Sequence, residues 1–351
     1  AVRLTRRLGS RYNYSAASQE FSGRYWAHGH LFGNQAIHLA ADFDNTDMLM
    51  LIGKNPMQSH HLPQARRTLR RMSRDPERLL VVVDPRRTET AELADIHLTL
   101  RPGTDALLLT AMIALILEEG LYDREYLAQH TAGFEEILPW FADFDVRGAL
   151  AVCELDYDLV ARTCREFAAR RSSVLDDLGI LMNRHSALVS YLIVVLLALC
   201  GRLGVPGGNV IDVWGKAAPD DPKAWRTLAT GIPAINGTFP PNVLPEEITS
   251  GLPERVRAVL CTAANPLRSY ADTTAYEEAF AQLDLLVVAD IVMSETAALA
   301  HYVLPCKTAF ESWDGTAGDG YPSVYARMRR PVLEAEGEQK ESGEICTLLA
   351  D

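Results

Sequence analysis

The chain has 351 residues, of which 48% are hydrophobic and 23% are charged, a balance that excludes an intrinsically disordered protein and suits two domains of common size. Its 46 acidic residues outnumber its 34 basic residues, for a formal net charge of −12. This charge argues against a general nucleic-acid-binding surface, which needs a basic excess to bind phosphates. An anionic ligand would have to be held by local arginines and backbone N–H groups.

A strand–helix–strand pattern comes first along the chain. The apolar run Asp47–Gly53 leads into the turn Gly-Lys-Asn-Pro, and the basic segment His60–Met72 follows with helical spacing. The valine-rich run Arg78–Pro85 then stops at Asp-Pro, and Ile96–Leu100 forms a further short apolar run. This order predicts a βαβ unit in a parallel sheet. A long apolar helix is expected after the turn that contains Pro102-Gly103-Thr104.

The centre of the chain is expected to be helical, with helices over Asp123–Gln129, Gly133–Trp140 and Asp156–Arg170. A new strand is expected near Arg171, and we place the change of domain there, so that the predicted domains are 1–170 and 171–332, with 333–351 beginning a further region. The apolar run Ala187–Cys200 is shorter than the ~20 residues of a membrane span and predicts a buried helix instead. An acidic loop rich in Pro and Gly follows over Lys216–Glu247.

The first pattern is repeated near the end of the chain. The segment Arg255–Pro266 again combines an apolar strand with an Asn-Pro turn, and a helix then leads to the valine-rich run Asp284–Asp290. The predicted fold class is therefore α/β, with two Rossmann-like parallel-sheet domains. No G-x-G-x-x-G follows either first strand, so the fingerprint of ordinary nicotinamide or flavin enzymes is missing.

The cysteines and the two ends of the chain bear on its surroundings. The six cysteines are scattered without a C-x-x-C, so the sequence predicts buried free thiols in a reducing compartment, not a zinc site or an iron–sulfur run. The first ten residues lack an initiator Met and the apolar core of a signal peptide. The last nine stop inside a predicted helix, so both ends are expected to be cut. A cytoplasmic bacterial location is expected, with the periplasmic side as the alternative.

Polar residues gather where the predicted strands end, which is where open parallel sheets bind ligands. Asp84 is placed to accept ribose hydroxyl groups, and Arg86 and Thr88 could hold a pyrophosphate near a helix start. Asp105 could read the donor edge of a guanine base through two hydrogen bonds, or it could cap the helix that begins there. Gly53 and Asn55 complete the set after the first strand.

The string VVVDPRRTETAELADIHLTLRPGTDALLLTAMIALILEEGLYDREYL resembles the molybdopterin oxidoreductase family that includes formate dehydrogenases and nitrate reductases. GKNP, GRLGVPGGNV and ADIVMSETAALAHYVLPCKTAFESWDGT belong to the same pattern, which runs from about Leu8 to Val332. The resemblance implies the formate dehydrogenase/DMSO reductase fold. It also implies a bis-molybdopterin guanine dinucleotide cofactor with Mo or W, and two-electron redox chemistry on a small substrate such as formate or an oxyanion.

The resemblance also implies roles for individual residues. Arg184 and His185 match a polar pair near the pterin, although His185 could be an ordinary helix-start histidine; Pro206-Gly207-Gly208 matches a loop that allows close backbone approach, and Glu311 is expected to be structural. The residues implied around one guanine dinucleotide are Gly53, Asn55, Asp84, Arg86, Thr88, Gly103 and Asp105. Those implied around the second are Ala263, Asn265, Asp290, Ser294, Glu295 and Thr296.

The metal ligand of the family maps onto an ambiguous stretch. Alignment to the L-G-[ST] element places Glu20 at or beside the ligand position, with Ser18 as the rival, and either could instead be a helix-entry polar residue. An oxygen ligand suits a hard Mo(VI) centre. His28, with His30, could transfer protons near the metal or could be a solvated loop histidine. Glu20 and His28 are therefore the predicted catalytic residues.

The chain also departs from the family pattern. The N-terminal region that often carries four cysteines for a [4Fe–4S] cluster, and the domain that closes over the pterins, have no counterpart in this sequence. We therefore expect an inactive central fragment that works with an iron–sulfur or other electron-transfer domain or subunit. One alternative is a degenerate scaffold, as in a respiratory complex I subunit. A nicotinamide dehydrogenase is disfavoured by the missing glycines. Retention of Asp84, Arg86, Asp105 and Asn265 favours descent from a cofactor-binding protein.

Overall fold

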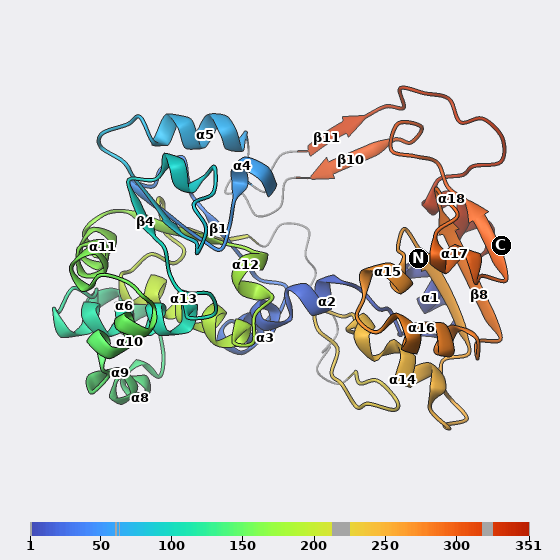
Figure 1. The fold of residues 1–351 in the computed structure, drawn as a ribbon, viewed down its shortest axis with the longest axis horizontal. Helices are drawn as coiled ribbons and strands as arrows, with labels where there is room; N and C mark the ends of the chain where they lie inside the picture. Colours follow the sequence, from blue (N-terminus) through green and yellow to red (C-terminus); the bar gives the residue numbers. More distant parts are fainter. Residues whose placement is uncertain (1, 60–61, 63, 213–224, 318–325, 351) are drawn as a thin grey trace. The chain divides into compact units, whose positions relative to one another are not determined.

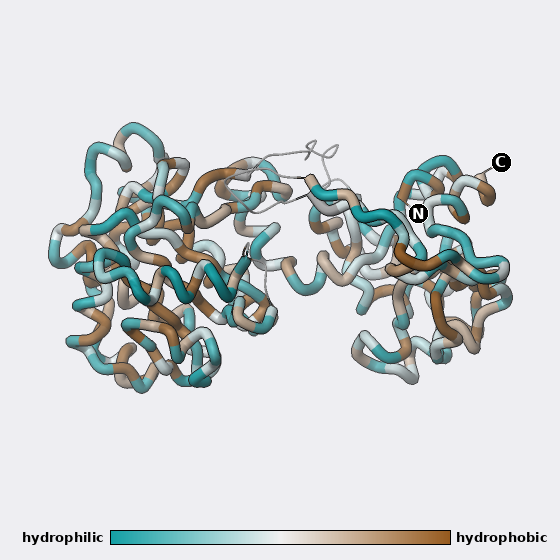
Figure 2. Tube along the Cα trace, turned by 90° about the horizontal axis from the view of Figure 1, so that it is seen from above, coloured by the Kyte–Doolittle hydropathy of each residue, from teal (hydrophilic) through white to brown (hydrophobic). Residues whose placement is uncertain are grey.

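The computed structural model describes residues 2–59, 62, 64–212, 225–317 and 326–350. The chain divides into two compact units. Unit 1 comprises Ala1–Gln19, Pro219–Ala317 and Tyr325–Asp351, and unit 2 comprises Glu20–Ala218 and Gly318–Val324. Each unit has its own hydrophobic core. Figure 2 shows hydrophobic segments passing through the inside of each unit, while many of the outer turns are hydrophilic.

Unit 2 is built on a four-stranded parallel sheet (Figure 1) with the strand order β4-β3-β2-β5. Strands β2 and β3 are runs of Met, Leu, Ile and Val whose side chains are almost all buried, as expected where helices cover both faces of a parallel sheet. The strands are β2 (Met48–Ile52), β3 (Leu79–Val83), β4 (Ile96–Leu98) and β5 (Ser172–Asp176). The βαβ unit predicted from the first pattern is confirmed.

Helices pack on both sides of this sheet and form two cores. One core contains α5 (Ala65–Met72), and the other contains α6 (Asp105–Glu118), α11 (Tyr157–Ala169) and α13 (Ser186–Leu199). The shorter helical elements are α3 (Ser22–Leu31), α4 (Pro56–Ser59), η1 (Ala91–Leu93), α7 (Arg124–His130), α8 (Phe134–Ile137), α9 (Pro139–Ala142), α10 (Val146–Val152) and α12 (Leu178–Leu181). A two-stranded antiparallel sheet joins β1 (His38–Ala41) to β6 (Asn209–Asp212).

Unit 1 contains a three-stranded parallel sheet in the order β7-β8-β9. Its strands are β7 (Ala258–Thr262), β8 (Leu285–Asp290) and β9 (Tyr302–Pro305), and β10 (Asp314–Ala317) pairs with β11 (Ala326–Arg329) in a separate hairpin. The helical elements are α1 (Val2–Arg7), η3 (Pro241–Val243), α14 (Leu244–Thr249), α15 (Pro266–Ser269), α16 (Thr273–Phe280), α17 (Glu295–Ala298) and α18 (Ser342–Leu348). The boundary between the two units falls between Gln19 and Glu20, within helix α2 (Ala17–Glu20).

The predicted domain boundary at residue 171 is wrong. The strand expected there is β5, but it pairs in parallel with β2, so the chain up to Ala218 belongs to the same unit as the first βαβ pattern. The Arg171 guanidinium also donates to the carboxylate of Asp47, with N–O distances of 2.8 and 2.7 Å. A strand belongs to the sheet with which it shares backbone hydrogen bonds, and sequence order does not reveal that partner across a long helical insertion. Residues 1–19, expected in the first domain, lie instead in unit 1.

Several local predictions are confirmed. The apolar run Ala187–Cys200 forms the buried helix α13, and no helix in the described ranges is both long and apolar enough to cross a membrane. Five of the six cysteines are buried free thiols, and Cys346 is partly exposed. Part of the predicted loop Lys216–Glu247 lies outside the described residues, and its last part forms η3 and the start of α14.

Candidate functional site

The carboxyl edge of the unit 2 sheet begins with a tight turn after β2. Gly53 has a φ of 57°, and its N–H donates to the Val83 carbonyl over 3.0 Å. Its own carbonyl accepts from the Gly179 N–H at 3.2 Å, and a Cβ on Gly179 would lie 2.8 Å from the Gly53 carbonyl carbon. Two glycines are therefore needed where the turn after β2 meets the start of α12.

Asn55 is held in one orientation by two neighbours. Its Oδ1 accepts from the Thr90 hydroxyl at 2.6 Å, and its Nδ2 donates to Glu89 Oε2 at 2.9 Å. Thr90 is fully buried, and its Oγ1 also accepts from the Met57 N–H at 3.3 Å. The hydrogen bond from Asn55 lowers the pKa of Glu89. This network fixes the Asn-Pro turn against the loop that follows β3.

Unit 1 repeats this network with different residues. The Asn265 Oδ1 accepts from the Thr296 hydroxyl at 2.7 Å, and its Nδ2 donates to Glu295 Oε2 at 2.6 Å. Thr296 is fully buried, and its Oγ1 accepts from the Leu267 N–H at 3.3 Å. The hydrogen bond from Asn265 lowers the pKa of Glu295. The two sheet edges therefore share one construction, which confirms the predicted repeat at the level of side-chain contacts.

The aspartates at the ends of β3 and β8 also correspond, with Asp84 directly after β3 and Asp290 the last residue of β8. Asp84 Oδ1 accepts from the Arg86 N–H at 2.8 Å, and Asp290 Oδ1 accepts from the Ile291 N–H at 2.7 Å. Four residues further on, the hydroxyl of Thr88 accepts from the Ala91 N–H at 3.1 Å. The hydroxyl of Ser294 accepts in the same way from the Ala297 N–H at 3.3 Å. Ser294 therefore caps α17, whereas the Thr88 hydroxyl binds the first N–H of η1, whose N-cap residue is Thr90.

The two edges differ in the residues that follow each aspartate. In unit 2 these are Pro85-Arg86-Arg87, all exposed, so guanidinium groups stand at the edge of the sheet. In unit 1 they are Ile291-Val292-Met293, which are 57%, 60% and 71% exposed. The unit 2 edge thus suits an anionic group, whereas the unit 1 edge presents apolar surface.

Asp105 adds a buried carboxylate to the edge of unit 2. It is the first residue of α6 and is only 8% exposed. Burial raises its pKa, and the charge of Asp84 raises it further. The N-cap residue of α6 is Thr104, not Asp105. Beside it, Gly103 has a φ of 83°, with open space where a Cβ would stand. Asp105 therefore adds a buried carboxylate next to an open glycine turn, within range of the charge of Asp84.

Two buried ion pairs at the end of β5 had not been predicted from the sequence. Lys54 Nζ lies 2.5 Å from Asp177 Oδ2, and Arg24 Nη2 lies 2.7 Å from Asp176 Oδ2. Burial works to raise the pKa of Asp176, but the charge and hydrogen bond of Arg24 outweigh it, so the pKa is lowered. The ion pair of Arg24 with Asp176 therefore ties α3 to the end of β5.

The predicted metal ligand, Glu20, and the predicted proton carrier, His28, come shortly after the unit boundary along the chain. Glu20 is the partly exposed last residue of α2, whereas Ser18 is 1% exposed and donates to the Ser15 carbonyl at 2.7 Å. His28 is a buried residue of α3 and not a solvated loop residue; its Nδ1 lies 2.8 Å from the Ile37 carbonyl oxygen, and burial lowers its pKa. Across the described ranges, no group of three His, Cys, Asp or Glu could hold a metal ion. Glu20 as a ligand and His28 as a proton carrier stay predictions.

The remaining predicted residues occupy loops. Arg184 and His185 are exposed at the start of α13, where the His185 N–H donates to Asn183 Oδ1 at 2.8 Å. In the glycine loop, a Cβ on Gly207 would lie 2.8 Å from the Asn45 carbonyl, so its close approach is to the chain's own backbone. Glu311 accepts from the Thr308 N–H and hydroxyl, at 2.8 and 2.7 Å, which agrees with its predicted structural role.

Glu89, Thr90 and Asp177 are the functional candidates that sequence reasoning missed. A signal for the first two is present in the chain. The tetrapeptide Thr-Glu-Thr-Ala begins at Thr88 and Ser-Glu-Thr-Ala begins at Ser294, each four residues after the aspartate that ends a strand. No comparable signal marks Asp177, because its partner Lys54 is 123 residues away.

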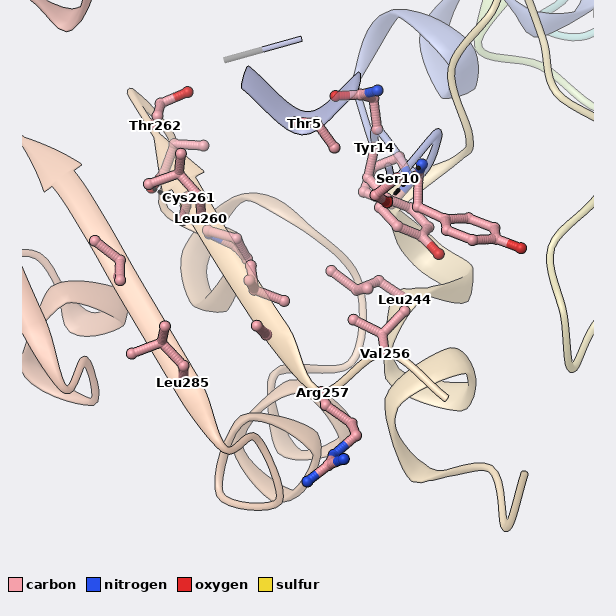
Figure 3. A pocket seen from close by; sticks show the side chains of 18 of the residues that line it. Thr5, Ser10, Tyr14, Leu244, Val256, Arg257, Leu260, Cys261, Thr262 and Leu285 are labelled. Atoms are coloured by element: carbon pink, nitrogen blue, oxygen red, sulfur yellow. Dashed lines mark hydrogen bonds between the residues drawn. The ribbon is translucent and has the colours of Figure 1, made fainter. Parts of the chain in front are cut away.

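A separate hollow of about 940 Å³ lies within unit 1 between the N-terminal segment and β7 (Figure 3). Tyr14 and Leu244 stand on one side of it and Leu260 and Cys261 on the other. The hydroxyl of Tyr14 is buried, without a hydrogen-bond partner in the described part of the chain. None of the predicted dinucleotide residues lines this hollow, but Thr262, Ala264 and Pro266, at and just after the carboxyl end of β7, do line it.

Comparison with known proteins points to one family. The chain matches the molybdopterin oxidoreductase family over residues 2–351. It is 30% identical over 352 residues to formate dehydrogenase H of Escherichia coli, covering 90% of this chain and 47% of that enzyme. It is 28% identical to the F420-dependent formate dehydrogenase subunit alpha of Methanocaldococcus jannaschii, covering 91% of this chain and 49% of that subunit.

A solved structure is similar as well. Acetylene hydratase from Pelobacter acetylenicus superimposes with a TM-score of 0.81 at 25% sequence identity, covering 99% of this chain and 52% of the enzyme. A nitrate reductase of Klebsiella oxytoca is 28% identical over 332 residues, covering 88% of this chain and 37% of the reductase. The chain thus spans about half the length, or less, of these relatives.

Proposed function

This chain belongs to the molybdopterin oxidoreductase family, and from that premise we propose that its two α/β units hold a bis-molybdopterin guanine dinucleotide cofactor with Mo or W. The observation that carries the proposal is the repeated network at the two sheet edges, Asn55–Glu89–Thr90 and Asn265–Glu295–Thr296. The network that the two edges share suits a cofactor with two similar dinucleotide arms, while the residues after Asp84 and Asp290 differ. Each unit is proposed to bind one arm at the carboxyl ends of its strands.

The residues at the unit 2 edge fit the chemistry of a guanine dinucleotide. Asp84 and Asp105 offer carboxylate acceptors for ribose hydroxyls and for the N–H donors of guanine. Arg86 and Arg87 are exposed guanidinium groups that can pair with phosphate oxygens. The open space at Gly103 lets a ligand approach the backbone.

When bound, the cofactor supplies two-electron redox chemistry at its metal. The chain's own part in this proposal is to bind and orient the two arms. Glu20 is proposed as the metal ligand and His28 as a proton carrier, with Arg184 and His185 near the pterin. The proposed substrate class is formate or a small oxyanion, because formate dehydrogenases and a nitrate reductase are among the relatives. One relative is named as subunit alpha, which supports a partner domain or subunit that carries electrons.

The test is metal and nucleotide analysis of the purified full-length protein from a host that makes the cofactor. Two GMP released per Mo or W support the proposal, whereas full-length protein without metal or GMP supports the scaffold alternative. Asp105→Ala is expected to reduce the GMP content by removing a base acceptor, and Asn265→Ala to reduce it by loosening the other edge. Asp143→Ala, at an exposed residue of unit 2, is the matched control and is expected to keep two GMP per metal.

A further inference from the structure

Helix α5 carries a strongly basic surface on an acidic protein. We define the arginine face as Arg66, Arg67, Arg70, Arg71 and Arg74, all exposed on α5 or within two residues of its end. The opposite side of the helix is buried through Ala65, Thr68, Leu69 and Met72. The helix is therefore held by its apolar side, and packing leaves the arginine side chains in solvent.

The fold itself does little to neutralise these charges. Within the part of the chain that the structure describes, only Arg71 of the arginine face forms an ion pair, with Asp44 at 3.0 Å, and both side chains are more than half exposed. Arg66 Nε donates to the Met57 carbonyl at 3.4 Å, and Arg67 donates to Gln64 at 3.3 Å. Arginines spaced four residues apart repel one another along the helix. Such a face is an unfavourable arrangement for the isolated molecule.

The side chains also border a shallow, open depression in the surface. The five arginines and Asp75 line an open hollow of about 620 Å³. Guanidinium groups are planar donors whose geometry matches carboxylates in pairs of hydrogen bonds. Five such groups around one open depression, with Asp75 as the single acidic residue of the lining, can pair with several carboxylates at once.

We propose that the arginine face docks a short acidic segment of a partner protein. The face runs over nine residues, or about 12 Å along a helix, which matches two to three turns of a segment with Glu or Asp at spacings of three and four residues. Arginine is also among the residues enriched in the centres of protein interfaces. The inference stands apart from the proposed cofactor function, because none of the predicted cofactor residues lies on this face.

The charge of the whole chain favours a short segment over an extended polyanion. A nucleic acid or an anionic membrane would extend well beyond about 12 Å and meet a molecule with a net charge of −12. A short acidic segment can contact the arginine face alone, and its attraction acts mainly within about 10 Å at moderate salt. The source of the carboxylates is therefore taken to be a protein.

The experiment measures binding of the full chain to a labelled helical peptide of about 16 residues with Glu at every third or fourth position. Arg66→Gln, Arg70→Gln and Arg74→Gln are combined in one variant. The matched control combines Arg124→Gln, Arg147→Gln and Arg162→Gln, three exposed arginines of the same unit, and so has the same net charge. Circular dichroism of both variants confirms that they are folded.

The expected result is that the first variant binds the acidic peptide roughly 10-fold more weakly while the control binds as the parent does, since each exposed pair contributes a few-fold. The parent affinity is also expected to fall from low to physiological salt. Combining Arg66→Glu, Arg70→Glu and Arg74→Glu should transfer binding to the matching Lys peptide. Undetectable peptide binding, equal loss in both Gln variants, or tighter binding of an oligonucleotide or of phosphatidylserine vesicles than of the peptide would overturn the proposal.

Discussion

At the scale of single residues, two threonines connect the chain's interior to its sheet edges. Thr90 and Thr296 are fully buried, and each hydroxyl both donates to an asparagine side chain and accepts from a backbone N–H. A buried hydroxyl with both roles satisfied stabilises the fold, and its loss leaves two partners unpaired. Because Thr90 and Thr296 make the same hydrogen bonds, replacing each of them tests whether the two edges are equally stabilised.

Replacing either threonine by valine keeps the shape and removes the hydroxyl. Thr90→Val and Thr296→Val are each expected to lower the free energy of unfolding by about 1–3 kcal/mol, measured by urea denaturation. Thr274→Val, at an exposed position on α16, is the control and should change it by less than about 0.5 kcal/mol. If Thr90→Val and Thr296→Val lower the free energy of unfolding no more than the control does, these networks do not stabilise the edges.

Asp105 predicts a dependence of stability on pH. Burial raises its pKa in the folded state above the unfolded value, so the ionised form is disfavoured in the folded protein. This lowers the free energy of unfolding by an amount that depends on pH. The loss is absent below the unfolded-state pKa of about 3.9, appears as the pH rises through that pKa, and is complete above the raised folded-state pKa. Asp105→Asn should therefore be more stable than the parent at pH 7, and the difference should shrink toward pH 4.

Urea denaturation of the parent and the Asp105→Asn variant at a series of pH values measures this difference. Asp143→Asn, at an exposed residue of the same unit, is the control and should show no comparable trend with pH. A difference for Asp105→Asn that stays constant between pH 4 and pH 7 would rule out the buried carboxylate as its cause. A lower GMP content in the same variant would support the proposal that Asp105 binds the cofactor and is kept at a cost in stability.

At the scale of elements, a single glycine lets two helices of unit 2 approach closely. Gly23 in α3 is buried against the start of α13, where an added Cβ would lie 2.6 Å from the Ala187 backbone nitrogen. Backbone cannot move aside as a flexible side chain can. Helix α3 also carries His28 and Arg24, the partner of Asp176. The close contact at Gly23 therefore helps to position both side chains.

Gly23→Ala is expected to destabilise the protein by about 1–3 kcal/mol, because the crowding outweighs the higher helix propensity of alanine. Thermal or chemical denaturation measures the change. The control is Gly343→Ala in α18, where the added Cβ meets open space and stability should rise by up to about 1 kcal/mol. A stabilising Gly23→Ala would mean that the two helices can separate at little cost.

At the scale of the whole molecule, the chain has two sets of core residues that do not overlap. The clusters of unit 2 draw on residues between Phe21 and Leu203, and those of unit 1 on Tyr14 and residues between Leu244 and Ile345. Units with separate cores can unfold in separate steps. The family's cofactor would then also act as a ligand that stabilises any unit to which it binds.

Two phenylalanine variants test this independence. Phe280→Ala in unit 1 and Phe167→Ala in unit 2 remove buried aromatic side chains and should each cost about 3–5 kcal/mol. We expect calorimetry to resolve two transitions, with each variant shifting only one of them. A single transition shifted equally by both variants would show that the units unfold together.

The sequence alone was sufficient for the family, the α/β class and the repeated strand–turn–helix–strand pattern. These properties depend on local order: apolar runs ending in Asn-Pro or Asp-Pro identify strand ends, and the string around Asp84 and Asp105 identifies the family. The sequence also predicted α13 as a buried helix, because its apolar run is too short to span a membrane.

Only the tertiary structure decided which segments belong together. The pairing of β5 with β2 moved the domain boundary, and Thr90, which the sequence had not singled out, became part of its edge through the contact with Asn55, 35 residues away along the chain. The physical reason is the same in each case. Backbone pairing and buried hydrogen bonds join groups that are close in space, and their energies do not depend on separation along the chain, so no local pattern specifies the partner.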